Sequence, residues 1–151
     1  MQEINIREFG EDDFEQLLEL FKEFSVFEKR PQMMVNDLTT MKAEKDYFKG
    51  FAAVLPNGQI VGYATYNFVY YTWSGKSIYM DDLYVKPDFR GTGLGKGLIN
   101  KVIDFAKENN CQKVKWQVSH WNVKAKEFYR SLGAVIDDNE QNCDLKLLSS
   151  D

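Results

Sequence analysis

The chain has 151 residues, of which 44% are hydrophobic and 15% aromatic, and its formal net charge is −4 with a pI of about 5.1. This length suits one well-packed domain over residues 1–151 and is too short for two ordinary ones. The acidic balance argues against nucleic acid as a partner, because binding a phosphate backbone requires clustered positive charge, and it suits a small cationic substrate.

The sequence lacks the signals of a membrane segment, a leader peptide or a metal site. No apolar run approaches the roughly 20 residues that cross a bilayer, and the N-terminus has no basic region followed by an apolar one. Cys111 and Cys143 have no second Cys or His at metal-ligand spacing, which favours free thiols. We therefore expect a soluble, cytoplasmic protein with no metal and no membrane contact.

The first third of the chain has one strand pattern and two helix patterns. Ile4 and Ile6 alternate with polar residues, which indicates a strand. Acidic residues at 11–13 precede apolar residues at 14, 17, 18 and 21, a spacing typical of an amphipathic helix that continues to about Phe27. A second short helix is predicted over residues 36–44, with Asn36 as its N-cap.

Hairpin patterns follow. Two arms at 51–55 and 59–70 flank a turn at 56–58, and a second turn at 72–76 leads into a central strand. We expect that strand over residues 78–85.

The central strand has an irregular apolar pattern. Ile78 and Met80 share one parity, whereas Leu83 and Val85 share the other. Either a β-bulge near Asp81 shifts the buried face by one residue, or both faces of the strand are buried and parity carries little information.

A glycine-rich turn joins this strand to a helical pattern. Arg90-Gly91-Thr92-Gly93-Leu94-Gly95-Lys96 opens the helix. The first turn of a helix leaves backbone N–H groups unpaired and carries partial positive charge, and glycines let phosphate oxygens approach the backbone closely. The turn is therefore predicted to bind phosphate.

The residues of this turn do not match either of two common phosphate-binding motifs. A Walker loop requires glycine five residues before the Gly-Lys pair, where this chain has Arg90, and Ser or Thr after it, where it has Gly97. A dinucleotide fingerprint requires an acidic residue after the next strand, whereas strand 113–118 is followed by Ser119 and His120.

The C-terminal third continues with a helix, a strand and a second helix. Apolar residues at 94, 98, 102, 105 and 106 give the first helix a buried stripe that ends at Asn109. A strand is predicted at 114–118, then a helix capped by Asn122 and stopped at Gly133. Residues 134–136 and 144–148 are predicted as closing strands. This order implies a mixed sheet with helices on both faces.

Arg-x-x-Gly-x-Gly between a strand and a helix resembles the acyl-CoA motif of the GNAT family of N-acetyltransferases. The blocks 71–76, 78–85 and 121–134 are similar to its diamine branch, which acts on spermidine, spermine or thialysine-like amines. The resemblance implies an α/β (α+β) fold with six to seven mostly antiparallel strands, of which the fourth and fifth splay apart. It also implies acetyl-CoA as cofactor, a small-molecule amine as acceptor and a homodimer.

The resemblance also suggests which residues are catalytic. Removing the proton from an amine at neutral pH requires a base, and the acidic position of the family matches Asp81, which we favour over Asp82. Asp is one methylene shorter than the Glu usual in this branch, which favours a bridging water. Tyr129 matches the tyrosine that protonates the departing thiolate, although its place on an apolar helix stripe also suits a core residue.

The same resemblance predicts the binding residues. For the cofactor these are Leu83, Tyr84 and Val85 along the pantetheine, Arg90, Gly91, Thr92, Gly93, Leu94, Gly95 and Lys96 at the pyrophosphate, and Asn122, Lys124 and Ala125 on its far side. For the amine they are Phe27, Glu28, Asp81, Asp82, Lys115, Trp116 and Gln117. Tyr71 stands where the spermidine-type pattern has an acid, which favours thialysine or short diamines. Two other functions stay open: an acyl-CoA sensor without catalysis, and acetylation of a protein amine.

Overall fold

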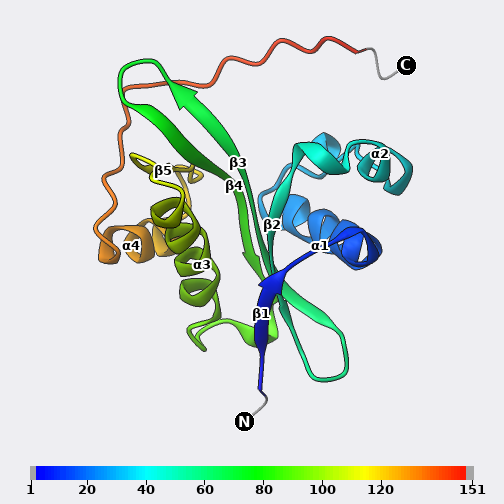
Figure 1. Ribbon diagram of the computed structural model, residues 1–151. Helices are drawn as coiled ribbons and strands as arrows, with labels where there is room; N and C mark the ends of the chain where they lie inside the picture. The colour runs from blue at the N-terminus through cyan, green and yellow to red at the C-terminus, as the bar shows by residue number, and fades with distance from the viewer. Residues whose placement is uncertain (1–2, 149–151) are drawn as a thin grey trace. The chain divides into compact units, whose positions relative to one another are not determined.

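A computed structural model describes residues 3–148, whose contacts group into two compact units, one up to Gln117 and one from Val118. The first unit holds a five-stranded sheet in the order β1-β2-β3-β4-β5 (Figure 1). Its strands are β1 Asn5–Glu8, β2 Lys49–Val54, β3 Ile60–Tyr71, β4 Gly75–Val85 and β5 Val114–Lys115. The pairings from β1 to β4 are antiparallel and only the β4–β5 pairing is parallel, which confirms the predicted mixed sheet.

Helices cover both faces of this sheet, as predicted. Helices α1 (Phe14–Phe27) and α2 (Leu38–Ala43) lie on one face, and α3 (Leu94–Glu108) lies on the other (Figure 1). Phe21 of α1 packs against Tyr63, with 5.0 Å between ring centroids, and Phe105 of α3 packs against Tyr66 at 4.8 Å. No helix in residues 3–148 has the length and apolar character needed to span a membrane.

The second unit contains α4, Val123–Ser131. The Asn122 Oδ1 atom accepts a hydrogen bond from the Ala125 amide at 3.1 Å, which confirms the predicted N-cap. The helix stops before Gly133, whose φ of +92° is readily adopted only by glycine.

The sequence prediction was wrong at three places. Asp37 rather than Asn36 caps α2, because its side chain accepts a hydrogen bond from the Thr40 amide at 2.8 Å. The strand expected at 114–118 is only two residues long. Within residues 134–148 no strand forms, so the sheet has five strands and not six to seven. The side chains of Val135 and Leu145 are 93% and 86% exposed, so the alternating apolar pattern there has no partner strand to bury it.

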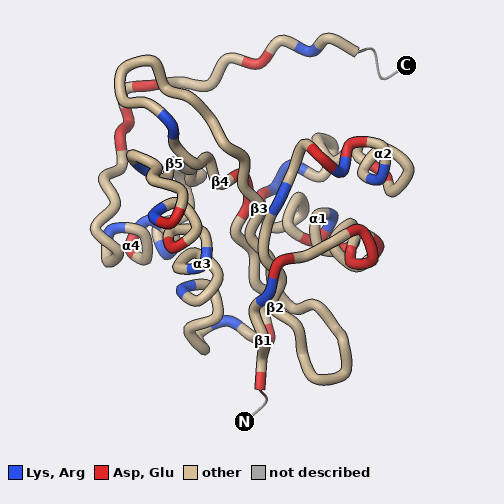
Figure 2. Tube along the Cα trace, in the orientation of Figure 1, with Lys and Arg blue, Asp and Glu red and all other residues tan. Residues whose placement is uncertain are grey.

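The connection from β4 to α3 carries basic residues ahead of the helix. Lys86 and Arg90 flank a 3-10 turn at Pro87–Phe89, and basic positions are visible on this connection in Figure 2. It brings the end of the central strand to the N-terminus of α3.

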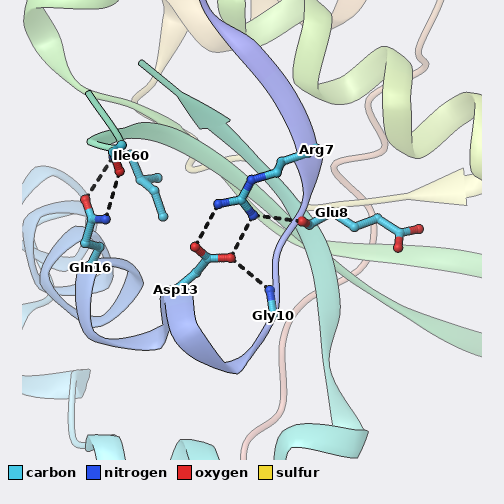
Figure 3. Close-up of polar contacts among 7 residues, drawn as sticks. Arg7, Glu8, Gly10, Asp13, Gln16 and Ile60 are labelled. Carbon is cyan, nitrogen blue, oxygen red and sulfur yellow. Dashed lines mark hydrogen bonds and ion pairs between the residues drawn. The ribbon is translucent and has the colours of Figure 1, made fainter. Parts of the chain in front are cut away.

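An ion pair fixes the entry to α1 (Figure 3). The Arg7 guanidinium donates to both carboxylate oxygens of Asp13 at 2.8 and 3.0 Å, and the Gly10 amide donates to the same carboxylate at 2.9 Å. These hydrogen bonds, that of Arg7 first, lower the pKa of Asp13. The pair therefore joins β1 to the first turn that leads into α1.

Replacing Asp13 by Asn should destabilise the fold. We expect a loss of about 2 kcal/mol at pH 7, measured by urea unfolding, because a partly buried charged hydrogen-bond network loses its acceptor. A lowered carboxyl pKa stabilises the fold above its unfolded value and that contribution disappears as pH falls through the folded pKa. The difference between Asp13→Asn and wild type should accordingly shrink below pH 4.

Asp12→Asn is the matched control, since Asp12 is exposed and adjacent. Equal stability of the two variants would contradict a structural role for the Arg7–Asp13 pair.

Candidate functional site

The central strand contains a bulge, the first of the two alternatives that its apolar pattern left open. Thr65 of β3 pairs with Asp82 of β4, whereas the next residue, Tyr66, pairs with Met80. Asp81 is therefore the extra residue, and the parity shift seen in the sequence is explained. The charges of Asp81 and Asp82 both raise the pKa of Tyr63 and Tyr79, after burial as the first cause, so both carboxyls lie near these rings. The bulge thus brings two successive carboxylates to the α1 face of the sheet.

Asp82 is held by its neighbours on β3. The buried Tyr63 hydroxyl donates to its Oδ2 atom at 2.8 Å, and the Asp82 amide donates to the Thr65 hydroxyl at 3.1 Å. Burial raises the pKa of Asp82 to about 7, the charges of Asp81 and Glu28 add to the rise, and the Tyr63 hydrogen bond opposes it. Such a group can hold or release a proton near neutral pH.

Asp81 differs from its neighbour in exposure. Its side chain is exposed, and partial desolvation raises its pKa. The bulge therefore offers an accessible carboxylate beside a partly buried one whose proton affinity is much higher than usual.

The start of α3 has the geometry of an anion site. Gly91 and Gly93 have φ of +77° and +84°, in the left-handed region that favours glycine. Gly93 is the N-cap, and no side chain in residues 3–148 caps the helix there. Thr92 donates its hydroxyl to the Phe89 carbonyl at 2.7 Å. The first amides of α3 are thus available to an external acceptor, which is what a pyrophosphate requires.

Some of the other residues predicted to bind the cofactor near this turn can contact it only through their backbone atoms. The side chains of Val85 and Leu94 are buried, whereas Lys96 is exposed. The pairing between β4 and β5 ends at Tyr79 and Lys115, so Met80–Val85 continues beyond its parallel partner. This segment, which includes Leu83 and Tyr84, has the unpaired edge that the splayed family fold implies.

A charged and aromatic cluster joins α1 to this turn. Glu23 accepts hydrogen bonds from Lys86 Nζ at 2.7 Å and from the Tyr84 hydroxyl at 3.2 Å. The Arg90 guanidinium lies 4.7 Å from the Phe27 ring centroid, and its Nε atom donates to the Val85 carbonyl at 2.8 Å. Phe27 and Arg90, one predicted at the amine and the other at the pyrophosphate, are in contact.

The residues predicted to bind the amine acceptor form two groups in the first unit. Glu28 ends α1, close enough for its charge to raise the pKa of Asp82. Lys115 lies away from this acid cluster in β5, with its Nζ atom 5.3 Å from the Tyr71 ring centroid. Trp116 and Gln117 directly follow β5.

The second unit carries the remaining predicted residues. Tyr129 is buried on α4, whereas Lys124 is exposed in its first turn. Asn122 and Ala125 hydrogen-bond to each other at the N-cap. The roles predicted for these four residues stay predictions.

Sequence reasoning missed Tyr63, Thr65 and Glu23. Each acts through a partner between 17 and 63 positions away, and only the register of the sheet reveals the pairing. Their signal in the sequence is the parity of the hairpin arms. Parity alone does not show which residues pair across the strands unless the position of the bulge is known.

Comparison with known proteins agrees with this geometry. A family model described as "Acetyltransferase (GNAT) family" matches residues 12–134. The chain is 34% identical to a thialysine N-epsilon-acetyltransferase of Sus scrofa, over 89% of the chain and 85% of that protein. It is 28% identical to a human spermidine/spermine N(1)-acetyltransferase-like protein 1, over 93% of the chain but only 22% of that longer protein.

A solved structure shows the same fold. The crystal structure of a predicted acetyltransferase with acetyl-CoA from Clostridium acetobutylicum superposes with a TM-score of 0.76, at 19% identity, over 94% of the chain and 96% of that protein. Together with the sheet, the bulge and the glycine-opened helix, these matches establish that the chain belongs to the GNAT family of acetyl-CoA-dependent N-acetyltransferases.

Proposed function

We propose that this enzyme transfers the acetyl group of acetyl-CoA to a primary amine of a small cationic acceptor, by direct attack with both substrates bound. The observation that carries the proposal is the pair of carboxylates that the bulge brings to one face of β4, the strand whose end leads into the glycine-opened N-terminus of α3. Acetyl-CoA supplies the acetyl group as a thioester and departs as a free thiol.

The residues at the start of α3 fit that group. Gly91 and Gly93 adopt positive φ and bring no Cβ to the turn, and no side-chain hydrogen bond from the described part of the chain caps α3 at Gly93. Lys96 adds positive charge, and Arg90 is available once it leaves the Phe27 ring. These residues would hold the pyrophosphate, and the edge of Leu83–Val85 would hold the pantetheine arm.

A carboxylate of the bulge acts as the general base. An amine with a pKa near 10.4 costs about 4 to 5 kcal/mol to deprotonate at neutral pH. In our proposal Asp81, directly or through a water, takes the proton of the ammonium group, and the freed lone pair forms the new C–N bond as the C–S bond breaks. Asp82, held beside it by the Tyr63 hydroxyl, takes that proton over from Asp81 in our proposal, because its raised pKa favours the protonated form.

The leaving thiolate needs a proton in return. We propose that Tyr129 supplies it from its hydroxyl, and that Asn122, Lys124 and Ala125 lie along the far side of the cofactor. The support for these roles is the match of the 121–134 block to the family pattern. Proton balance is restored when the two groups exchange protons with solvent.

The names of the relatives suggest the acceptor class. Thialysine, and more distantly spermidine and spermine, appear in them, and Phe27, Glu28, Asp82, Lys115, Trp116 and Gln117 are the residues we propose to line the acceptor site. A single domain, a homodimer and a cytoplasmic location stay predictions.

A thiol-release assay tests the proposal. Acetyl-CoA is incubated with thialysine, putrescine, spermidine or a peptide, and we expect amine-dependent release of CoA that is fastest with a small diamine or a lysine-like amine. Tight CoA binding without thiol release from any amine would contradict the proposal and favour a sensor, and preference for the peptide would indicate a protein acceptor.

Tyr129→Phe serves as the internal control of that assay. It should lower kcat at least tenfold with little change in CoA affinity, because only the donated proton is lost. Unaltered turnover would remove Tyr129 from the mechanism.

A further inference from the structure

Thr65 lies on β3 opposite the bulge of β4. Before the bulge, Met80 pairs with Tyr66. After it, Leu83 pairs with Ala64. Between these two pairs β3 has one residue, Thr65, whereas β4 has two. Only one of the two β4 residues can therefore pair with Thr65, and the other is the extra residue of the bulge.

The pairs on either side of the bulge are fixed by burial. The side chains of Ile78 and Met80 are buried before it, and those of Tyr84 and Val85 are buried after it. Because side chains alternate between the two faces of a strand, a slip of one residue would move each of them to the opposite face. The bulge can therefore move only between positions 81 and 82.

Two arrangements of the acids are compatible with this register. Either Asp82 pairs with Thr65 and Asp81 is the extra residue, as in the structure, or the two acids exchange places. The arrangements differ chemically, because the Tyr63 hydroxyl donates to the Oδ2 atom of Asp82 at 2.8 Å while the side chain of Asp81 is exposed. The partner of Thr65 is thus the acid that is held against Tyr63.

The Thr65 side chain makes a hydrogen bond that distinguishes the two arrangements. The Asp82 amide donates to the Thr65 hydroxyl at 3.1 Å, and Thr65 is buried. A buried amide that loses its acceptor costs free energy, so this hydrogen bond favours the arrangement in which Asp82 lies opposite Thr65. Valine has the same shape and would leave the amide without that acceptor.

The other groups around Asp82 act on its charge. Burial is the largest cause of its raised pKa, the charges of Asp81 and Glu28 add to the rise, and the hydrogen bond from Tyr63 opposes it. The charge of Asp82 in turn raises the pKa of Tyr63 and Tyr79. Thr65 is uncharged, so its influence on this cluster comes from the position that it gives to Asp82.

We propose that Thr65 is a positioning residue, whose hydroxyl holds the Asp82 amide and thereby selects Asp82 as the partner of Tyr63 and Asp81 as the exposed acid that meets the amine. This inference rests on the proposed acetyl transfer and adds to it a residue that acts through Asp82. The different roles of two adjacent aspartates are then set from the neighbouring strand.

Removal of the Thr65 hydroxyl tests the inference. Thr65→Val keeps the shape of the side chain, whereas Thr65→Ser keeps the hydroxyl. In assays of thiol release we expect Thr65→Val to lower kcat at least about tenfold with little change in KM for acetyl-CoA, because proton transfer is disturbed and the cofactor site is not. Thr65→Ser should retain most of the wild-type kcat.

The pH profile of kcat separates positioning from a general loss of structure. The acidic limb of the wild type should lie near pH 7, where Asp82 titrates. Once Asp82 leaves its buried position its pKa should fall, so the limb should move to lower pH in Thr65→Val and stay in place in Thr65→Ser. Adding Tyr63→Phe to Thr65→Val should then leave the limb where it is, because the carboxyl is no longer held against Tyr63.

Ser77→Ala is the matched control for the loss of a buried hydroxyl. Ser77 is buried on the same hairpin and donates its hydroxyl to the Gly75 carbonyl at 3.2 Å, away from the bulge. This variant should unfold at a lower urea concentration than the wild type and keep the wild-type kcat and acidic limb. If Thr65→Val does not fold, Thr65→Ala removes the same hydroxyl without placing a methyl group against the Asp82 amide, and the same results are expected of it.

A variant without the Thr65 hydroxyl that keeps the wild-type kcat and acidic limb would overturn the positioning role and leave acetyl transfer standing. A limb that Tyr63→Phe still moves in that variant would do the same. Absence of amine-dependent thiol release from the wild type, with CoA still bound, would overturn the proposed function and this inference with it. The two failures are therefore distinguishable in one set of assays.

Discussion

Replacement of Asp82 by Asn is expected to lower kcat for acetyl transfer by about a hundredfold, the usual scale for losing a group that takes part in proton transfer. The variant keeps the shape of the side chain and an oxygen that can accept the Tyr63 hydroxyl, but it cannot carry negative charge. It also removes the charge that raises the pKa of the neighbouring tyrosines. The measurement is the initial rate of thiol release at saturating acetyl-CoA and amine.

The pH profile identifies the group responsible. Burial and the neighbouring charges raise the pKa of Asp82 to about 7. Asp82 must be ionised to take over the proton that Asp81 accepts from the amine, so the rate should fall as pH drops below about 7. Tyr63→Phe removes the hydrogen bond that stabilises the carboxylate, and it should move this acidic limb upward by about one pH unit. A limb that stays in place in Tyr63→Phe would exclude the Asp82–Tyr63 pair from proton transfer.

Asp82→Asn should also raise the free energy of unfolding at alkaline pH. A carboxyl whose folded pKa lies above its unfolded value stabilises the fold fully at low pH, and that contribution disappears as pH rises through the folded pKa. Between about pH 4 and 7 the wild type should therefore lose stability relative to Asp82→Asn. At pH 8 we expect the variant to be more stable by on the order of 1–2 kcal/mol in urea unfolding.

Asp104→Asn, on the exposed surface of α3, provides the control for the loss of one negative charge. If it matches Asp82→Asn in rate or stability, net charge rather than the buried carboxyl would explain the results.

Replacement of Gly93 by Val is expected to weaken CoA binding by at least about a hundredfold. Gly93 has a φ of +84°, and a β-branched residue adopts this region only with strain of about 1–3 kcal/mol. No atom lies within 4 Å of the position of a Cβ at Gly93, so the strain comes from the backbone and not from a clash. Relief of that strain would rotate the amides at the start of α3 away from the pyrophosphate. Titration calorimetry with CoA measures the effect.

The chain contains a matched control for this substitution. Gly58, in the turn between β2 and β3, has a φ of +91° and also no neighbour within 4 Å of a Cβ. Gly58→Val should destabilise the fold by a similar amount and leave the affinity for CoA as in the wild type. Equal affinities of the two variants would show that the turn before α3 does not bind the cofactor.

The sequence predicted the parts of the site that depend on local pattern. Gly91 and Gly93 have positive φ, and the parity change between Met80 and Leu83 marked the place of the bulge, because both signals lie within a few residues. The parity change alone left open whether both faces of the strand are buried instead. The sequence could not decide how Asp81 and Asp82 differ. Their exposure depends on Tyr63 and Thr65, which the hairpin register brings opposite the bulge.

Other features depended on contacts that no local pattern encodes. Lys115 was predicted at the amine by its position, but its charge is held at the Tyr71 ring, a contact between β5 and the end of β3. The closing strands at 134–136 and 144–148 had the right alternation and still did not form, since a strand also needs a partner for its backbone hydrogen bonds.

The most direct test of the account is a crystal structure of the enzyme with CoA. We expect pyrophosphate oxygens within about 3 Å of the amides of residues 93–96, with Arg90 moved from the Phe27 ring to the phosphates and the thiol end beside Asp81. Pyrophosphate bound elsewhere, with the turn before α3 closed by its own side chains, would contradict it.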